Sequence, residues 1–87
     1  MWVQPKEYEI VGTALAHARE EAGLTQTQLA RILREPQSFV SNFERGQRRI
    51  DVLELVRIVD ALRAEPSEVF TDILNRLGRG RPRKGNR

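Results

Sequence analysis

Helix-starting and helix-stopping residues follow one another at short intervals in this sequence, and this pattern restricts its possible folds more than any other feature. Gly23, Gly46 and Gly78 stand where helices commonly end, and Pro36 and Pro66 stand where they commonly begin. Between these positions, apolar residues recur at the three- and four-residue spacing of amphipathic helices. A chain of 87 residues has room for one small domain. We therefore predict an all-α fold of short helices and short turns.

Five helices are expected, and they cover residues 7–22, 26–33, 36–45, 52–62 and 66–77. Thr25 and Gln28 form a capping box at the start of the second helix, and Asp51 can cap the fourth. Pro36 and Pro66 occupy the first turns of the third and fifth, where a missing N–H costs nothing. The apolar stripe expected on the fourth helix consists of Val52, Leu55, Val56, Ile58, Val59 and Leu62.

Composition excludes several classes of protein. The chain has no cysteine and a single histidine, His17, so we expect no disulfide, no thiolate metal site and no zinc cluster. No Ser/His/Asp set, buried carboxylate pair or Gly-rich phosphate loop is recognisable, so we expect neither enzyme activity nor a cofactor. Without a candidate membrane span or signal peptide, the expected location is cytoplasmic, in a prokaryote or encoded by a phage.

The charges are distributed unevenly along the chain. Residues 1–77 carry ten Lys or Arg and twelve Asp or Glu, whereas residues 78–87 carry five Lys or Arg and no acid. The last segment also lacks aliphatic and aromatic side chains, so it cannot bury a core. We therefore expect a folded domain over residues 1–77 and a disordered basic tail over residues 78–87.

The stretch GLTQTQLARILREPQSFVSNFERGQRR places two capped helices about three residues apart, which is helix-turn-helix geometry. Val40 and Phe43 are expected to point toward the core. The outer face of the later helix then carries four short polar side chains, Gln37, Ser38, Ser41 and Asn42. Gln and Asn can present a donor and an acceptor together to adenine, and Ser can bond either base type, so we expect base contacts. Phe39 either packs on the preceding helix or lies against a thymine methyl group.

Phosphate contacts require donors on both sides of such a reading helix. Gln26 and Thr27 lie at the N-terminus of the preceding helix, where N–H groups and the positive end of the dipole favour anions. A polar and basic cluster without an acid follows the reading helix and comprises Arg45, Gln47, Arg48 and Arg49. We expect both groups to contact DNA phosphate.

Three short motifs occur once each, at specific spacing, within residues 8–75. They are AREEAGLTQ with its arginine, the helix opening LTQxxLA, and the run QSxVSxxERG. In this combination the sequence resembles the Cro and phage-repressor (XRE) helix-turn-helix family. The resemblance implies a five-helix, lambda-repressor-like domain, commonly a dimer, whose third helix enters the major groove. It also implies a partly buried ion pair between Arg19 and Glu44. At Arg34 the family usually has glycine, so the turn either relaxes or holds a strained left-handed residue.

The basic tail contains the stretch RGRPRK, formed by Arg79, Gly80, Arg81, Pro82, Arg83 and Lys84. Its core resembles the AT-hook, in which an extended Arg-Gly-Arg segment lies in the minor groove of A·T tracts. Two other interpretations are non-specific attraction to phosphate and an inert tail.

The last expected helix carries more apolar surface than one face of a terminal helix can bury on its own domain. The residues concerned are Phe70, Ile73, Leu74 and Leu77. We predict that they form a homodimer interface.

These features together predict a sequence-specific regulator that binds double-stranded DNA and represses transcription by occupying an operator. Two alternatives remain open. An antitoxin or adaptor would use the same fold mainly to hold a protein partner, and an architectural nucleoid-type binder would depend on the tail. No membrane interaction is expected.

Overall fold

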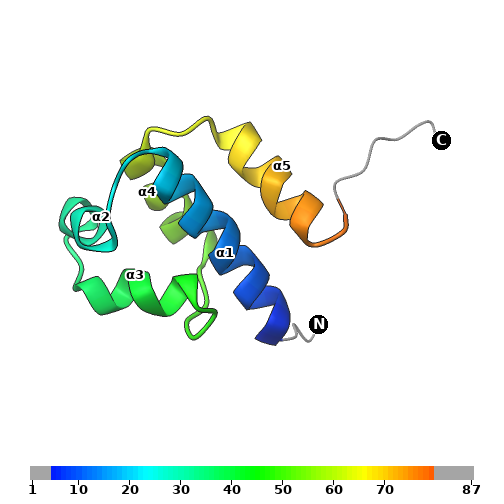
Figure 1. Ribbon diagram of the computed structural model, residues 1–87, viewed down its shortest axis with the longest axis horizontal. Coiled ribbons are helices and arrows are strands. Elements are labelled where there is room, and N and C mark those ends of the chain that lie inside the picture. Colours follow the sequence, from blue (N-terminus) through cyan, green and yellow to red (C-terminus); the bar gives the residue numbers. More distant parts are fainter. Residues whose placement is uncertain (1–4, 80–87) are drawn as a thin grey trace.

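The computed structural model describes residues 5–79, which form five α-helices around one core (Figure 1). The helices are α1 (Pro5–Glu21), α2 (Gln26–Leu33), α3 (Gln37–Glu44), α4 (Val52–Leu62) and α5 (Pro66–Arg76). This part of the chain contains no β-strand, so the predicted all-α class is confirmed. None of its helices is long and apolar enough to cross a membrane.

Two helices begin with the caps that the sequence predicts. Thr25 Oγ1 accepts a hydrogen bond from the Gln28 N–H at 3.1 Å, and Gln28 Oε1 accepts one from the Thr25 N–H at 2.9 Å. Asp51 caps α4 in the same way, with a second capping box closed by Glu54. The expected start of the third helix is wrong by one residue. Pro36 has an extended ψ of 154° and is the N-cap, so α3 begins at Gln37.

The turn between α2 and α3 holds a strained residue. Arg34 has left-handed backbone angles, with φ 60° and ψ 42°. Of the two expected outcomes, the turn therefore holds a strained left-handed residue and does not relax. The Glu35 N–H donates to the Ala30 carbonyl at 2.9 Å, and the Arg57 side chain on α4 donates to the Leu33 carbonyl at 2.6 Å. These bonds satisfy carbonyl groups at the end of α2 and hold the turn in place.

The core is formed by apolar residues from all five helices, and α1 lies between α3 and α5 (Figure 1). Gly12 of α1 permits this arrangement, because a Cβ atom there would lie 2.3 Å from the Phe43 carbonyl oxygen and 2.4 Å from that of Glu44. The buried apolar residues are Ala14, Leu15, Leu29, Ala30, Leu33, Val40, Phe43, Ile58, Val59, Leu62, Val69 and Ile73. α1 therefore supports α3 through direct backbone contact.

Part of the predicted α4 stripe is wrong. Val52 is 74% exposed and Val56 is 50% exposed, whereas Ile58 and Leu62 are buried. At about 100° per residue, Val52 and Val56 lie beyond the edge of the arc that faces the core. The exposed Leu53 extends the same side of the helix, so α4 presents an apolar flank to solvent.

Candidate nucleic-acid interface

The outer face of α3 carries the four polar side chains that the sequence predicts as base contacts. Gln37, Ser38, Ser41 and Asn42 are exposed or half-buried. Val40 and Phe43, on the opposite face, are 0% and 1% exposed. The amide and hydroxyl groups of the four polar residues therefore lie on the side of α3 that is accessible to base edges.

A chain of hydrogen bonds connects this reading face to α1. Gln37 Nε2 donates to Gln26 Oε1 at 2.7 Å, and Gln26 Nε2 donates to Glu44 Oε1 at 2.8 Å. Glu44 in turn accepts from Arg19 Nε at 2.7 Å and from Arg19 Nη2 at 3.1 Å. The first residue of α3 is thus tied to its last residue, and the last residue is tied to α1.

The Arg19–Glu44 ion pair is shielded from water, since the side chains are 11% and 6% exposed. Its hydrogen bonds raise the pKa of the Arg19 guanidinium above the ordinary value, although burial opposes the shift. A further bond runs from Arg19 Nη1 to the Leu24 carbonyl at 2.8 Å. A buried pair satisfied on both sides orients elements more than it adds net stability, because desolvation offsets much of the attraction.

The two expected phosphate donors on α2 are placed differently. Gln26 is half-buried and its side chain is directed to Glu44 and Gln37, whereas Thr27 is exposed. Sequence reasoning missed the bridging role of Gln26, since nothing in the local pattern shows which side chains meet across the turn. Thr27, in the first turn of α2, remains exposed to an anionic ligand.

The loop between α3 and α4 carries the predicted basic cluster, and all four side chains are exposed. Arg45 Nη2 donates to Asn42 Oδ1 at 3.1 Å, which links the loop to the reading face. The Arg49 guanidinium lies 5.5 Å from the centroid of the Tyr8 ring on α1. Gln47 and Arg48 complete the cluster, so three guanidinium groups flank the C-terminal end of α3.

Arg48 is the most constrained member of this loop. Its guanidinium donates to both carboxylate oxygens of Glu54 at 2.9 Å and lies 4.6 Å above the centroid of the Phe39 ring. Phe39 is half-buried and packs edge-on against Phe43 at a centroid distance of 5.5 Å. The Phe39 ring therefore packs on its own helix and beneath an arginine. The pairing of Arg48 with Glu54 was not expected from the sequence.

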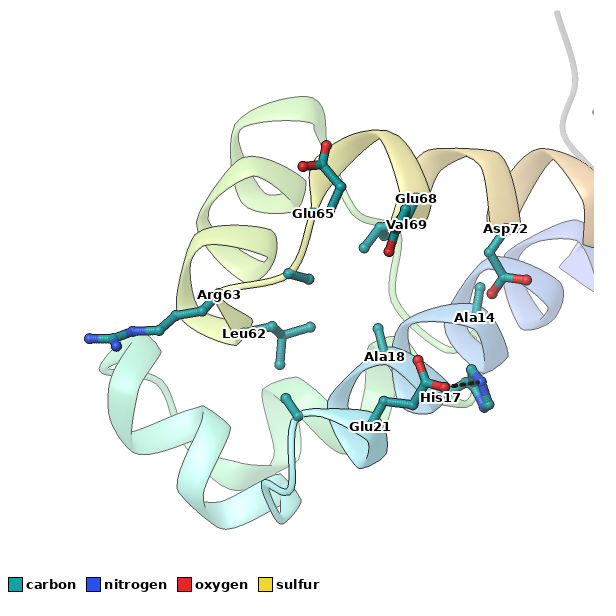
Figure 2. A pocket seen from close by; sticks show the side chains of 12 residues that line it. Ala14, His17, Ala18, Glu21, Leu62, Arg63, Glu65, Glu68, Val69 and Asp72 are labelled. Atoms are coloured by element: carbon teal, nitrogen blue, oxygen red, sulfur yellow. Dashed lines mark ion pairs between the residues drawn. The ribbon is translucent and has the colours of Figure 1, made fainter.

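Four acidic side chains lie together away from α2 and α3. A cleft between α1 and α5, with the end of α4 at its edge, is lined by Glu21, Glu65, Glu68 and Asp72 (Figure 2). Within it His17 Nε2 lies 3.3 Å from a Glu21 carboxylate oxygen. Since no residue of α2 or α3 lines this cleft, an acidic body and a basic reading side coexist in one small domain.

Gly78 and Arg79, which the sequence analysis assigned to the tail, contact the folded domain. The Gly78 N–H donates to the Asn75 carbonyl at 3.0 Å and the Arg79 N–H donates to the Leu74 carbonyl at 2.7 Å, which closes the last turn of α5. The Arg79 guanidinium lies 3.5 Å from a Glu7 carboxylate oxygen on α1. Arg79 therefore contacts the folded domain. The other predicted arm residues, Gly80, Arg81, Pro82, Arg83 and Lys84, lie outside the described residues.

The predicted dimer face on α5 needs one correction. Ile73 is only 5% exposed and packs in the core of its own domain, because it lies one turn beyond the buried Val69 on the same side of α5. Leu74 and Leu77 are half-buried, and Phe70 is 54% exposed. Beside Phe70 lies an apolar groove of about 210 Å³ between α4 and α5, with Leu55, Val56, Val59, Pro66 and Val69 in its walls.

Among residues 5–79, no group of three or more His, Asp or Glu side chains could hold a metal ion. The structure thus offers a polar helix face flanked by guanidinium groups as its main candidate for ligand recognition. That arrangement suits a polyanion with hydrogen-bonding edges.

Comparison with known proteins agrees with this geometry. A family model described as helix-turn-helix matches residues 15–69. The XRE-family like protein from Pseudomonas syringae pv. tomato str. DC3000 is 34% identical, with a TM-score of 0.69 over 80% of this chain and 85% of that chain. The restriction-modification controller protein C.AhdI from Aeromonas hydrophila is 32% identical, with a TM-score of 0.69 over 76% and 96% of the two chains. The clp gene regulator ClgR from C. glutamicum is 28% identical, with a TM-score of 0.73 over 79% and 88%. No curated protein gives a significant match.

Proposed function

Because this chain belongs to the XRE-type helix-turn-helix family and is a DNA-binding transcriptional regulator, we propose that it represses transcription by occupying an operator in double-stranded DNA. One observation carries this proposal: α3 exposes a face of amides and hydroxyls while its position is fixed from α1 by the Arg19–Glu44 pair. A rigid helix with such a face can read base edges in the major groove. Repression by occupancy requires no bond to be made or broken.

Four residues of α3 are assigned to base contacts and the surrounding donors to phosphate. Gln37, Ser38, Ser41 and Asn42 would lie in the major groove. The exposed Thr27 and the backbone N–H groups at the start of α2 would bind phosphate on one side of the groove, and Arg45 and Arg49 on the other. The acidic cleft between α1 and α5 would face away from DNA.

The experiment begins with selection of bound duplexes from a random pool, which supplies a specific site. Gln37→Ala and Asn42→Ala should each weaken binding to that site by about 1–3 kcal/mol and leave binding to random duplex nearly unchanged. Asn75→Ala on α5 is the matched control, because it removes an exposed amide outside α2, α3 and their loops. Equal losses on the selected and random duplexes would contradict the assignment of α3 as the reading helix.

We further propose that two copies of the chain associate through the exposed apolar residues of α4 and α5. Val56 and Phe70 line the α4–α5 groove, and Val52 and Leu53, which are 74% and 76% exposed, lie in the first turn of α4, before Val56. Apolar surface of this kind is costly to leave in water, and a two-fold axis would bury the same patch on both copies. Dimers of this kind would read two half-sites related by the same symmetry.

Sedimentation of the full chain measures the association directly. Phe70→Ser should shift the protein toward monomer at a given concentration. Ile32→Ser is the matched control, because Ile32 is 53% exposed but lies on α2 and outside the groove. A wild-type chain that sediments only as monomer, or an equal shift in both variants, would contradict the proposed interface.

A further inference from the structure

The loop between α3 and α4 contains one arginine whose charge is already matched. Arg48 Nη1 and Nη2 each donate to a Glu54 carboxylate oxygen at 2.9 Å, and Nη1 also donates to the Arg49 carbonyl at 2.8 Å. The fork-to-fork geometry is the strongest form of a guanidinium–carboxylate pair. Contact with the Phe39 ring at 4.6 Å fixes the plane of the guanidinium as well. Arg48 is thus restrained by three hydrogen bonds and one aromatic ring.

Glu54 is held just as firmly. Its backbone N–H donates to Asp51 at 2.8 Å and its Oε1 accepts the Asp51 N–H at 3.1 Å, so the carboxylate is anchored to the first turn of α4. The Glu54 side chain is 20% exposed. The bonds from Arg48, and then that from Asp51, lower the pKa of this carboxyl group below its ordinary value. Glu54 is therefore ionised at neutral pH, and its capping-box bonds hold the carboxylate at the start of α4.

The neighbouring cations of this loop differ from Arg48. Within the described residues, Arg45 bonds the neutral Asn42 and Arg49 lies against Tyr8, and neither forms an ion pair with a carboxylate. Both keep a positive charge for an anionic ligand. Arg48 stands between them on the same loop, yet Glu54 cancels its charge.

Non-specific binding to DNA comes almost entirely from cations that contact phosphate. We propose that Glu54 is a specificity-determining residue, because its carboxylate holds Arg48 against Phe39 and so withholds one cation from non-specific contacts with phosphate. The inference rests on the proposed function, since it concerns the same DNA-binding side. Without the carboxylate, the Arg48 side chain would be free to reach phosphate on any duplex, whatever its sequence.

Glu54→Gln tests this directly, because glutamine can close the same capping box, as Gln28 does at Thr25. The variant should bind random duplex about three- to tenfold more tightly than wild type, with the slope of log affinity against log salt steeper by about 0.9. Affinity for the selected duplex should gain less, so discrimination should fall. In the double variant Arg48→Ala with Glu54→Gln, the gain on random duplex should disappear.

Glu68→Gln is the control for net charge, because it removes one carboxylate from the cleft between α1 and α5. If Glu54→Gln and Glu68→Gln bind random duplex with equal affinity and equal salt slope, the inference is overturned. A gain that persists in the double variant overturns it too. The proposed function is tested separately. A wild-type chain that binds selected and random duplexes equally contradicts sequence-specific repression. The comparison of variants on random duplex would still show whether Glu54 withholds Arg48 from phosphate. A chain without affinity for any duplex overturns both.

Discussion

Gly12→Ala is expected to disturb the contact on which the position of the reading helix depends. A Cβ atom at residue 12 would lie 2.3 Å from the Phe43 carbonyl oxygen, 2.4 Å from the Glu44 carbonyl oxygen and 2.7 Å from the Glu44 carbonyl carbon. Real Cβ atoms essentially never approach other heavy atoms more closely than 3.0 Å. All three neighbours belong to the backbone of α3, so no side chain can rotate away. α1 and α3 must separate.

The size of the effect follows from two opposing contributions. Inserting an extra methyl group into a close-packed contact costs about 1–3 kcal/mol, and rigid backbone neighbours favour the upper end. Alanine is better than glycine inside a helix by about 1 kcal/mol, which offsets part of this cost. We therefore expect the free energy of unfolding to fall by about 2 kcal/mol. For a domain of this size the melting temperature should drop by roughly 8–16 °C.

Thermal and urea unfolding followed by circular dichroism measure this change, and binding to the selected duplex well below the melting temperature measures the displacement of α3. Gly23→Ala is the comparison, because a Cβ atom there has no neighbour within 4 Å and only the φ of +77° opposes it. That variant should lose about 1 kcal/mol and keep its affinity for DNA. If Gly12→Ala is as stable as wild type, or more stable, the close approach of α1 to α3 is refuted.

Three further predictions concern separate parts of the chain. Arg34→Gly should raise the free energy of unfolding by about 0.5 kcal/mol, because the relief of left-handed strain outweighs the cost of a more flexible unfolded chain. Arg31→Gly, inside α2, should instead lower the free energy of unfolding by about 1 kcal/mol. Since the pKa of Glu54 is lowered in the folded state, its contribution to stability is present above about pH 4.5 and is lost as pH falls through the folded pKa, so Glu54→Gln should flatten the acid limb of a stability–pH curve. Deleting residues 80–87 removes four Lys or Arg and should reduce the magnitude of the salt slope by about 2–3 while leaving the melting temperature unchanged; an unchanged slope would show that this segment does not contact DNA.

The sequence predicted the structural features that depend on a few adjacent residues, such as where a helix begins and which of its sides faces the core. The capping box of Thr25 and Gln28 requires only two side chains three residues apart, so the start of α2 follows from the sequence alone. The inward direction of Val40 and Phe43 follows from helical periodicity. The left-handed Arg34 was one of two expected outcomes, since the strain is local but its tolerance depends on Arg57, which reaches over from α4.

Features that depend on which helices meet could not be predicted in the same way. The spacing of Asp51 and Glu54 signals a capping box, but nothing nearby shows that the same carboxylate pairs with Arg48. The periodicity of α5 marks Val69, Phe70 and Ile73 alike as apolar, and only packing against α1 shows that Ile73 is buried while Phe70 is exposed. Gly12 has no local signature at all, because its role arises from the approach of a helix about thirty residues away.

The direction of the hydrogen bonds around Glu44 determines how Gln37 can meet a base. An ionised carboxylate only accepts hydrogen bonds, so Gln26 must turn its NH₂ group toward Glu44 and its oxygen toward Gln37. Gln37 must then donate from its own NH₂ group, as it does at 2.7 Å. One N–H and the carbonyl oxygen of the Gln37 amide remain outside this chain of bonds. A donor and an acceptor in one plane are what a bidentate contact to adenine N7 and N6 requires. The Glu44 carboxylate, which ties α3 to α1, therefore also sets the orientation of the Gln37 amide at the opposite end of α3. Glu44→Gln should weaken binding to the selected duplex even where the fold survives.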